Sequence, residues 1–247
     1  MQRMSLLEHC IIPEWPAPKN VQALQTTRNG GMSGAPYDSL NLGGHVGDVP
    51  FAVARNRTLL GPLLPSEPVW LKQVHGTVVA DAAQADCWPE ADACVSSHAG
   101  AVCVVMTADC LPVLLCNERG SVVAAAHAGW RGLCDGVIEQ TVRAMNVQPG
   151  TLMAWLGPAI GAQAFEVGEE VRAAFIARQP QAAAAFISGT PDKWLADIYQ
   201  LARLRLNALG ITRIYGGGLC TYTDSARFYS YRRDGVTGRM GTFIWLG

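Results

Sequence analysis

The stretch TADCLPVLLCNERGSVVAAAHAGWRG, residues 107–132, decides the fold class because it contains two apolar runs of strand length. Residues 113–116 and 122–126 are rich in apolar side chains and bounded by Pro or Gly, which predicts two buried strands. The polar residues Asp109 and His127 lie at their ends, and His127 directly precedes a glycine-rich bend. Carboxylates and imidazoles are uncommon in such buried surroundings unless they are paired or functional. The same stretch therefore indicates a site as well as a sheet.

Elements outside this stretch follow the same two periodicities. Apolar runs predict further strands at residues 21–27, 69–74, 77–80, 101–107, 153–156 and 211–215. Helical spacing predicts helices near 50–60 and over 132–145, 167–178 and 194–209. The closing segment SYRRDGVTGRMGTFIWL is typical of a hairpin around Asp234-Gly235. Strands and helices interleave without strict alternation, which predicts a mixed-sheet α/β protein, and the lack of repeats or linkers favours one domain over residues 1–247.

The composition favours a compact fold and excludes several classes of partner. The chain has 247 residues, of which 49% are hydrophobic and 16% charged, so a large core can form. A net charge of −1 without any Lys/Arg run gives no sign of a positively charged surface that would bind nucleic acid or a membrane. No segment approaches the roughly 20 apolar residues of a membrane span, and Glu8, His9 and Pro13 interrupt any signal-peptide pattern. We expect a cytoplasmic protein whose eight cysteines are reduced rather than paired.

Three of the five histidines, His45, His75 and His127, lie in glycine-flanked polar turns where apolar segments end. Cys110 follows Thr-Ala-Asp and precedes Leu-Pro at a predicted strand end. Each of these residues alone is explained more simply as a hydrogen-bonded histidine or a buried cysteine. The set His75, Cys110 and His127 matches no zinc-finger spacing, and three ligands from separate strand ends suit an open catalytic zinc site.

Arginines close to these turns are candidates for anion binding. Arg28, Arg57 and Arg131 lie near them, and a guanidinium fork binds phosphate or carboxylate groups well. Most arginines are solvated surface residues, which is the simpler interpretation of each. Arg131 is the best placed, because it follows His127 in the motif HAGWRG.

Motifs along essentially the whole chain resemble the YfiH-type family, which is known as laccase-domain polyphenol oxidase, purine nucleoside phosphorylase and peptidoglycan editing factor. The resemblance is carried by these segments: TTRNGGMSGAPYDSLNLGGHVGD, WLKQVHG, MTADCLPVLLC, AAHAGWRG, AWLGPAIG, FEVG and YSYRRDGVTGRM. It implies a four-layer α/β/β/α sandwich with mixed sheets. It also implies zinc ligands at His75, Cys110 and His127, with His45 and Arg57 as substrate or phosphate contacts.

The resemblance further implies phosphorolysis of adenosine, inosine, guanosine and methylthioadenosine, together with adenosine deamination. In that reaction Arg57 and Arg131 can hold the phosphate, and His45 can donate a hydrogen bond. Asp109, beside a ligand, is a candidate proton carrier.

Three other functions use the same residues. Cys110 with a histidine can form a thiolate pair that cleaves amide bonds in a peptidoglycan precursor, with Cys110 as the catalytic nucleophile. A His₂Cys set can also hold Cu²⁺, which outcompetes zinc at such donors, and so support polyphenol oxidation. The sequence has five histidines and no His-X-His pair, which are too few ligands for the four coppers of a multicopper oxidase. Such an enzyme is therefore excluded unless several chains contribute ligands to shared sites. Finally, the metal can be purely structural and hold three strand ends together.

Overall fold

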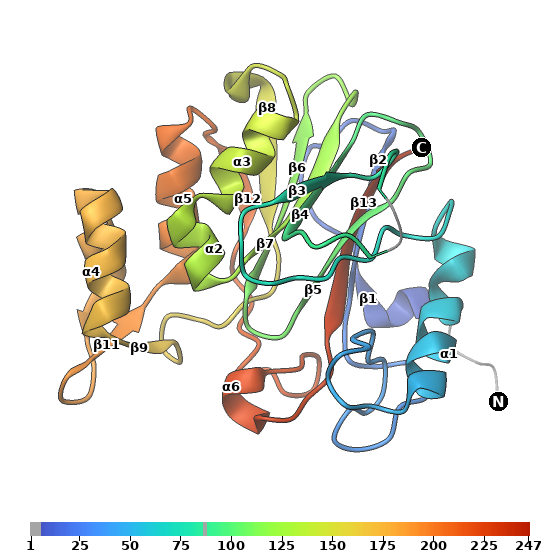
Figure 1. Ribbon diagram of the computed structural model, residues 1–247, viewed down its shortest axis with the longest axis horizontal. Coiled ribbons are helices and arrows are strands. Elements are labelled where there is room, and N and C mark those ends of the chain that lie inside the picture. The colour runs from blue at the N-terminus through green and yellow to red at the C-terminus, as the bar shows by residue number, and fades with distance from the viewer. Residues whose placement is uncertain (1–5, 86–87) are drawn as a thin grey trace.

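The computed structural model describes residues 6–85 and 88–247, whose strands form three sheets (Figure 1). The six-stranded sheet contains, in spatial order, β12 (Arg213–Gly216), β8 (Leu152–Leu156), β6 (Leu111–Asn117), β7 (Val123–Ala128), β4 (Ala93–Ser96) and β3 (Val79–Asp81). The four-stranded sheet contains β1 (Cys10–Ile11), β2 (Val21–Thr26), β13 (Met240–Leu246) and β5 (Cys103–Thr107). A small sheet is formed by β10 (Phe186–Ser188), β11 (Lys193–Ala196) and β9 (Glu166–Gly168).

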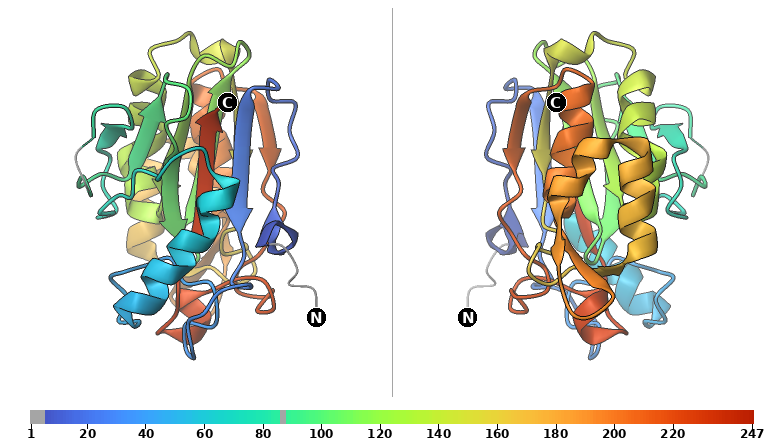
Figure 2. Two further views of the ribbon diagram at one scale, coloured as in Figure 1. Left: turned by 90° about the vertical axis from the view of Figure 1, so that its right-hand side faces the viewer. Right: turned by 90° about the vertical axis from the view of Figure 1, so that its left-hand side faces the viewer.

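The helices lie on the two outer sides of the larger sheets (Figure 2). Helix α1 (Pro50–Leu60) covers the four-stranded sheet, where Leu60 packs with Leu24, Val104 and Phe243. The opposite side carries α2 (Trp130–Asp135), α3 (Val137–Ala144), α4 (Glu169–Arg178) and α5 (Ile198–Ala208). The short α6 (Tyr231–Asp234) precedes β13, and short 3₁₀ helices occupy Leu6–His9, Gly61–Leu63, Pro149–Thr151 and Pro180–Ala185.

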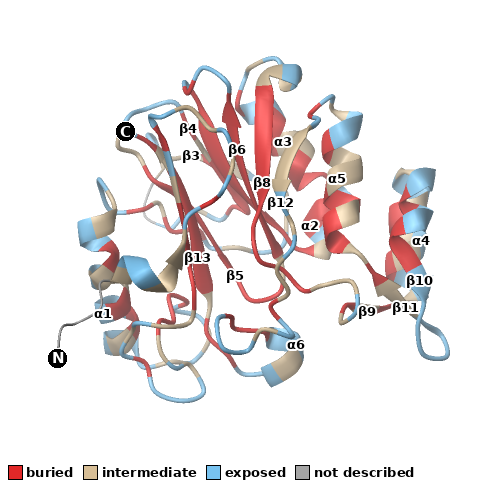
Figure 3. Cartoon of the chain, turned by 180° about the vertical axis from the view of Figure 1, so that it is seen from behind, coloured by how far each residue is buried: buried red, intermediate tan, exposed pale blue. Residues whose placement is uncertain are grey.

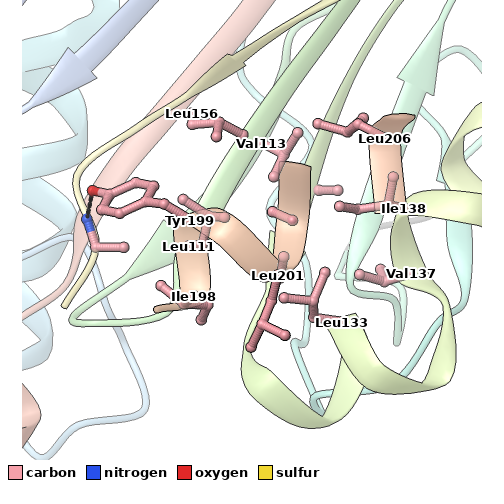
Figure 4. Close-up of a cluster of buried hydrophobic side chains, with 14 of the residues drawn as sticks. Leu111, Val113, Leu133, Val137, Ile138, Leu156, Ile198, Tyr199, Leu201 and Leu206 are labelled. Carbon is pink, nitrogen blue, oxygen red and sulfur yellow. Dashed lines mark hydrogen bonds between the residues drawn. The ribbon is translucent and has the colours of Figure 1, made fainter. Parts of the chain in front are cut away.

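The stretch 107–132 supplies the centre of the six-stranded sheet. Strands β6 and β7 pair antiparallel, with Leu111 opposite Ala128 and Pro112 opposite His127, and every residue of both strands is buried (Figure 3). One face packs on the four-stranded sheet through side chains such as Leu114 and Ile244. The other face packs on the helices through the cluster in Figure 4, which includes Leu111, Val113, Leu133, Val137, Ile138, Leu156, Ile198, Tyr199, Leu201 and Leu206. Each large aliphatic side chain buried there contributes about 1.5–3 kcal/mol to the stability of the fold. The centre of the sheet is therefore a stable support for the residues at its strand ends.

The predicted mixed α/β class is confirmed, whereas several predicted elements need correction. The three-stranded sheet was not expected, and its strands β9 and β11 occupy the first residues of the predicted helices 167–178 and 194–209. Asp197 caps the start of α5 by accepting a hydrogen bond from the Gln200 backbone N at 2.9 Å. The predicted helix 132–145 is broken at Gly136, whose φ of 103° suits glycine and interrupts helical geometry.

Two predicted strand assignments are wrong. Residues 69–74 form only isolated bridges, at Val69 and Lys72, and the backbone N–H of Val74 donates to the Asp92 carboxylate instead of to a neighbouring strand. The C-terminal hairpin does not form, since β13 pairs with the distant strands β2 and β5 and its predicted turn is the helix α6. Strand β4 was missed altogether. In the described part of the chain, no helix has the length and apolarity that a membrane crossing requires, and the seven described cysteines are free thiols.

Candidate metal centre

Three side chains predicted as metal ligands meet where β6, β7 and the loop before β3 come together. Cys110 directly precedes β6, His127 lies in β7 opposite Pro112, and His75 lies in the loop with a φ of 62°. Their potential ligand atoms all lie within 4.8 Å of one another. The Cys110 Sγ is 3.8 Å from the His75 Nε2, and the two imidazole centroids are 4.8 Å apart. The antiparallel register of β6 and β7 therefore assembles most of this group.

Asp92, which was not predicted from the sequence, holds two of these residues in place. Its carboxylate is fully buried and accepts a hydrogen bond from His127 Nδ1 at 2.8 Å. It also accepts backbone N–H bonds from His75 at 2.9 Å, Gly76 at 2.6 Å and Val74 at 3.1 Å. With the proton of neutral His127 on Nδ1, the Nε2 lone pair is left for a ligand. The signal available in the sequence was an aspartate directly before the short apolar run of β4.

Glycine is required at two positions of the HAGWRG motif. A β-carbon on Gly129 would lie 2.8 Å from His75 Cδ2 and 3.0 Å from Cys110 Sγ. A β-carbon on Gly132 would lie 2.7 Å from the Gly76 carbonyl oxygen. All three distances are shorter than van der Waals contact, so any larger residue would push the His75 loop away from Cys110. The glycine-rich bend thus allows the loop to approach β7.

The side chains of this group shift one another's protonation in the metal-free protein. Burial opposes ionisation of Cys110, but His127 and His75 outweigh it and lower the thiol pKa to about 6. Burial likewise disfavours protonated His127, but Cys110 and Asp92 raise its pKa to about 9. Burial would raise the pKa of Asp92, yet the hydrogen bonds from His127 and the loop amides lower it overall. At neutral pH the metal-free pair is therefore a thiolate and an imidazolium, and the deprotonated sulfur is the form that binds metals or attacks electrophiles.

The donor set fits a metal ion. Two imidazole nitrogens and one thiolate match an open three-ligand zinc site, and the same donors suit copper. The hydrogen bond that His127 Nδ1 donates to the Asp92 carboxylate is the usual support for a metal-binding histidine. Within residues 6–85 and 88–247, His75, Cys110 and His127 form the one group of this kind. A trinuclear copper cluster would need additional histidine ligands beside it.

A cavity of about 340 Å³ opens onto these ligands. It is lined by His45, Gln73, His75, Met106, Thr107, Ala108, Cys110, His127, Tyr231 and Arg239. Burial lowers the pKa of His45, and the positive charges of Arg239, Arg57 and His127 lower it further. These groups therefore surround His45 with positive potential. Arg239, which was not predicted from the sequence, is the arginine that lines the metal cavity itself.

The other predicted site residues are placed differently. The guanidinium of Arg57 lies over the rings of Trp70 and Trp88, at 3.9 and 4.5 Å, and faces an adjoining cavity. The carboxylate of Asp109 accepts hydrogen bonds from Thr221 Oγ1 at 2.6 Å and from the Arg232 backbone N at 2.7 Å.

Arg131 is exposed on α2 and lies over the ring of Trp130 at 4.6 Å. Of the residues predicted for the site, Asp109, Arg57 and Arg131 thus do not line the metal cavity, whereas His45 does.

Fold and site together define a mixed α/β protein with a two-histidine, one-cysteine group that can bind a metal. The chain belongs to the YfiH family, whose model is described as multi-copper polyphenol oxidoreductase laccase and matches residues 22–247. The resemblance found in the motifs is thereby confirmed.

Individual relatives match over nearly their whole length. The chain is 58% identical over 239 residues to purine nucleoside phosphorylase YfiH of Escherichia coli (strain K12), covering 96% of this chain and 98% of that protein. It is 54% identical over 237 residues to a purine nucleoside phosphorylase of Pseudomonas aeruginosa, with coverage of 96% and 98%. A crystal structure of a Neisseria meningitidis protein superposes with a TM-score of 0.94 at 53% identity, covering 96% of this chain and 99% of that one.

Proposed function

We propose that this protein is a metal-dependent purine nucleoside phosphorylase with zinc as its resident ion and copper as a competing one. The observation that carries the proposal is the convergence of His75, Cys110 and His127 on a cavity that also contains Arg239 and His45. The Escherichia coli and Pseudomonas aeruginosa relatives, both named purine nucleoside phosphorylases, share more than half of the aligned residues with this chain. The proposed substrates are adenosine, inosine, guanosine and methylthioadenosine, each with inorganic phosphate.

The proposed reaction exchanges one bond at the ribose. A phosphate oxygen forms a bond to C1′, the bond from C1′ to the purine nitrogen breaks, and the purine leaves with a proton as ribose 1-phosphate forms. A bound metal would supply Lewis-acid charge beside the reacting groups. Arg239 donates from Nη1 to the carbonyls of Thr237 and Gly238 at 3.0 Å each, which fixes a guanidinium that can hold a phosphate dianion.

His45 adds no charge at neutral pH, because its pKa is lowered, and it can hydrogen-bond the substrate from the cavity wall. Arg57 contributes positive potential from the adjoining cavity, in place of the direct phosphate contact expected for it. We propose adenosine deamination as a second activity of the same cavity, since a metal-activated water can attack C6 of adenine. Asp109 could carry a proton only by exchanging its present bonds to Thr221 and Arg232.

One assay tests this function. Metal-free and zinc-loaded protein are incubated with adenosine and phosphate, and the products are separated. Adenine with ribose 1-phosphate, dependent on zinc, is the expected result, and inosine would show deamination. Neither product from zinc-loaded protein would contradict the proposal.

A second candidate function is favoured by a specific arrangement, that of Cys110, His127 and Asp92. The thiol pKa of about 6 makes Cys110 a thiolate at neutral pH beside the imidazolium of His127, and Asp92 orients that imidazole at 2.8 Å. This order of nucleophile, base and orienting carboxylate is the order found in cysteine hydrolases. It supports an amidase with Cys110 as the nucleophile, and the family resemblance suggests a peptidoglycan precursor as its substrate. Zinc would then inhibit hydrolysis and a chelator would restore it, whereas activity that rises with bound zinc would exclude this candidate.

Polyphenol oxidation is the third candidate, and it depends on copper in the same group. The sequence has only five histidines, and across the described residues one His/Cys group of metal-binding type occurs. We propose that any phenol oxidation comes from Cu²⁺ that replaces zinc at these donors. Oxidation that persists in zinc-loaded protein after rigorous removal of copper would contradict this.

A further inference from the structure

The loop that joins β2 to α1 carries His45 into the metal cavity and contains a fully buried asparagine, Asn41. The Asn41 Oδ1 accepts hydrogen bonds from the backbone N of Gly43 and from the backbone N of Arg239, both at 2.9 Å. The Asn41 Nδ2 donates to the Gly43 carbonyl at 3.2 Å and to Asp48 Oδ2 at 2.9 Å. One side chain therefore joins the His45 loop to Arg239, which lies 198 residues further along the chain.

The same loop holds Arg239 at its backbone and at its side chain. The Arg239 backbone N donates to Asn41, and the Arg239 carbonyl accepts from the Leu42 backbone N at 3.1 Å. A β-carbon on Gly43 would lie 2.8 Å from Arg239 Cγ, so the arginine packs directly over this glycine. A β-carbon on Gly238 would lie 2.9 Å from Asn41 Cβ. Because both distances are shorter than van der Waals contact, this part of the loop sets the direction in which Arg239 enters the metal cavity.

Asp48 decides which end of the Asn41 amide faces Arg239. A carboxylate only accepts hydrogen bonds, so the amide nitrogen faces Asp48 and the amide oxygen faces the backbone N of Arg239. Asp48 Oδ2 also accepts from Ser33 Oγ at 2.6 Å. Asn56, which is fully buried on α1, donates to Ser33 Oγ and to the Asn41 carbonyl, both at 2.9 Å. A buried polar network thus connects Arg239 to α1, and the loss of one member leaves others without a partner.

We propose that Asn41 is a positioning residue for phosphate binding, because it fixes Arg239 relative to His45 in the cavity. The inference rests on the proposed phosphorylase function, in which Arg239 holds the phosphate. A guanidinium binds phosphate through directional N–H bonds, so a displacement of about 1 Å weakens the contact. Arg239 Nη1 also donates to the carbonyls of Thr237 and Gly238, but these residues directly precede Arg239 and move with it. The bond to Asn41 instead ties Arg239 to the loop that carries His45.

The substitution Asn41→Ala tests the positioning role through the binding of inorganic phosphate, measured by calorimetry on zinc-loaded protein. We expect the phosphate affinity to fall by about tenfold, close to the effect of Arg239→Ala, while the bound zinc stays unchanged. The matched control is Asn117→Ala. Asn117 is also buried, and its side chain also accepts from backbone N atoms of a turn, those of Ser121 at 2.8 Å and Val122 at 3.4 Å. Both variants should unfold at a lower temperature than the wild type, but only Asn41→Ala should bind phosphate more weakly.

A double-mutant cycle separates positioning from a general loss of stability. In the Arg239→Ala background, Asn41→Ala should weaken phosphate binding no further, because Asn41 acts through Arg239. An equal loss of affinity in both backgrounds would overturn the positioning role. If Asn41→Ala does not fold, Gly43→Ala carries the same test, since its β-carbon meets Arg239 Cγ and the bonds of Asn41 remain. Its control is Gly34→Ala in the same loop, where a β-carbon meets nothing within 4 Å and phosphate binding should stay unchanged.

Release of purine from adenosine separates this inference from the proposed function. Zinc-loaded wild type that binds phosphate more tightly than Asn41→Ala, but releases no purine, would support the positioning role and contradict only the phosphorylase. Phosphorolysis by Asn41→Ala with the wild-type KM for phosphate and the wild-type phosphate affinity would overturn the positioning role alone.

Discussion

The metal cavity and the cavity that adjoins it under α1 differ in how the fold builds them. The metal cavity is fixed by the register of β6 and β7, by the buried Asp92 and by the close approach at Gly129. The adjoining cavity is bounded by one helix, α1, and by residues such as Ala54 and Lys72 that remain exposed. Substitutions of the metal-binding group and of Asp92 should therefore act through metal binding, whereas substitutions of the exposed residues around the adjoining cavity should leave the bound metal unchanged.

The largest expected effect is that of Cys110→Ala. Removal of the thiolate leaves two imidazoles, so the protein should lose its zinc and its kcat/KM should fall by about 10³-fold or more. Metal analysis and the phosphorolysis assay measure both. The control is Cys10→Ala, a half-buried thiol that donates to the Leu6 carbonyl at 3.3 Å and should retain full metal and activity. Full activity in Cys110→Ala would remove the metal cavity from the mechanism.

The next effect is that of Asp92→Asn, which keeps the shape of the side chain and removes its charge. Loss of the carboxylate weakens the orientation of His127 and of the His75 loop, so zinc affinity should fall by about 10–100-fold. Competition with a chromophoric chelator measures the affinity, and the spectrum of the Co²⁺-loaded protein reports the ligand geometry. The control Asp81→Asn alters a carboxylate at the end of β3 that accepts a hydrogen bond from the Ala83 backbone N at 2.9 Å. Equal zinc affinity in Asp92→Asn and the wild type would show that the His75 loop and His127 keep their positions without the charge of Asp92.

A smaller change is expected with pH in the metal-free protein. His127 and His75 outweigh burial and hold the pKa of Cys110 at about 6, so its thiolate is present above pH 6 and is lost as the pH falls below it. The alkylation rate of Cys110 by iodoacetamide should thus rise about tenfold between pH 5 and 7. Peptide mass spectrometry measures this rate and compares it with that of Cys116, because burial raises the pKa of the Cys116 thiol to about 12. A midpoint near the ordinary cysteine value would contradict the thiolate–imidazolium pair.

The smallest effect separates two arginines. Arg239 lines the metal cavity, so Arg239→Ala should raise the KM for phosphate by about tenfold. Arg131 is exposed and lies over Trp130, so Arg131→Ala should change that KM by less than about twofold. Steady-state kinetics with varied phosphate compares them. A larger rise in the KM for phosphate with Arg131→Ala than with Arg239→Ala would contradict this and would support the phosphate contact that the sequence suggested for Arg131.

The sequence predicts best what is local. Strands β6 and β7 lie within one apolar stretch, so the residues at their ends made Cys110 and His127 candidates for a site, and the family resemblance then indicated that they are metal ligands. Asp92 escaped because β4 is four residues long and too short to show a period. Arg239 escaped because it reaches the cavity only when β13 pairs with β2 and β5, a contact between distant parts of the chain.

Proximity in sequence was also misleading. Asp109 and Arg131 adjoin metal-binding candidates along the chain, but their side chains are directed to Thr221 and Trp130 instead. A positive φ of 90° at Asp109 marks the turn that separates its carboxylate from the neighbouring cysteine. Direction, rather than distance along the chain, decides which side chains share a cavity.

Titration of the metal-free protein with zinc tests the central claim most directly. Phosphorolysis of adenosine and bound zinc are measured on the same samples. We expect activity to rise in proportion to bound zinc and to level off at one ion for each His75, Cys110 and His127 group. Full activity without bound metal, or activity that falls as zinc binds, would contradict the account and favour Cys110 as a nucleophile.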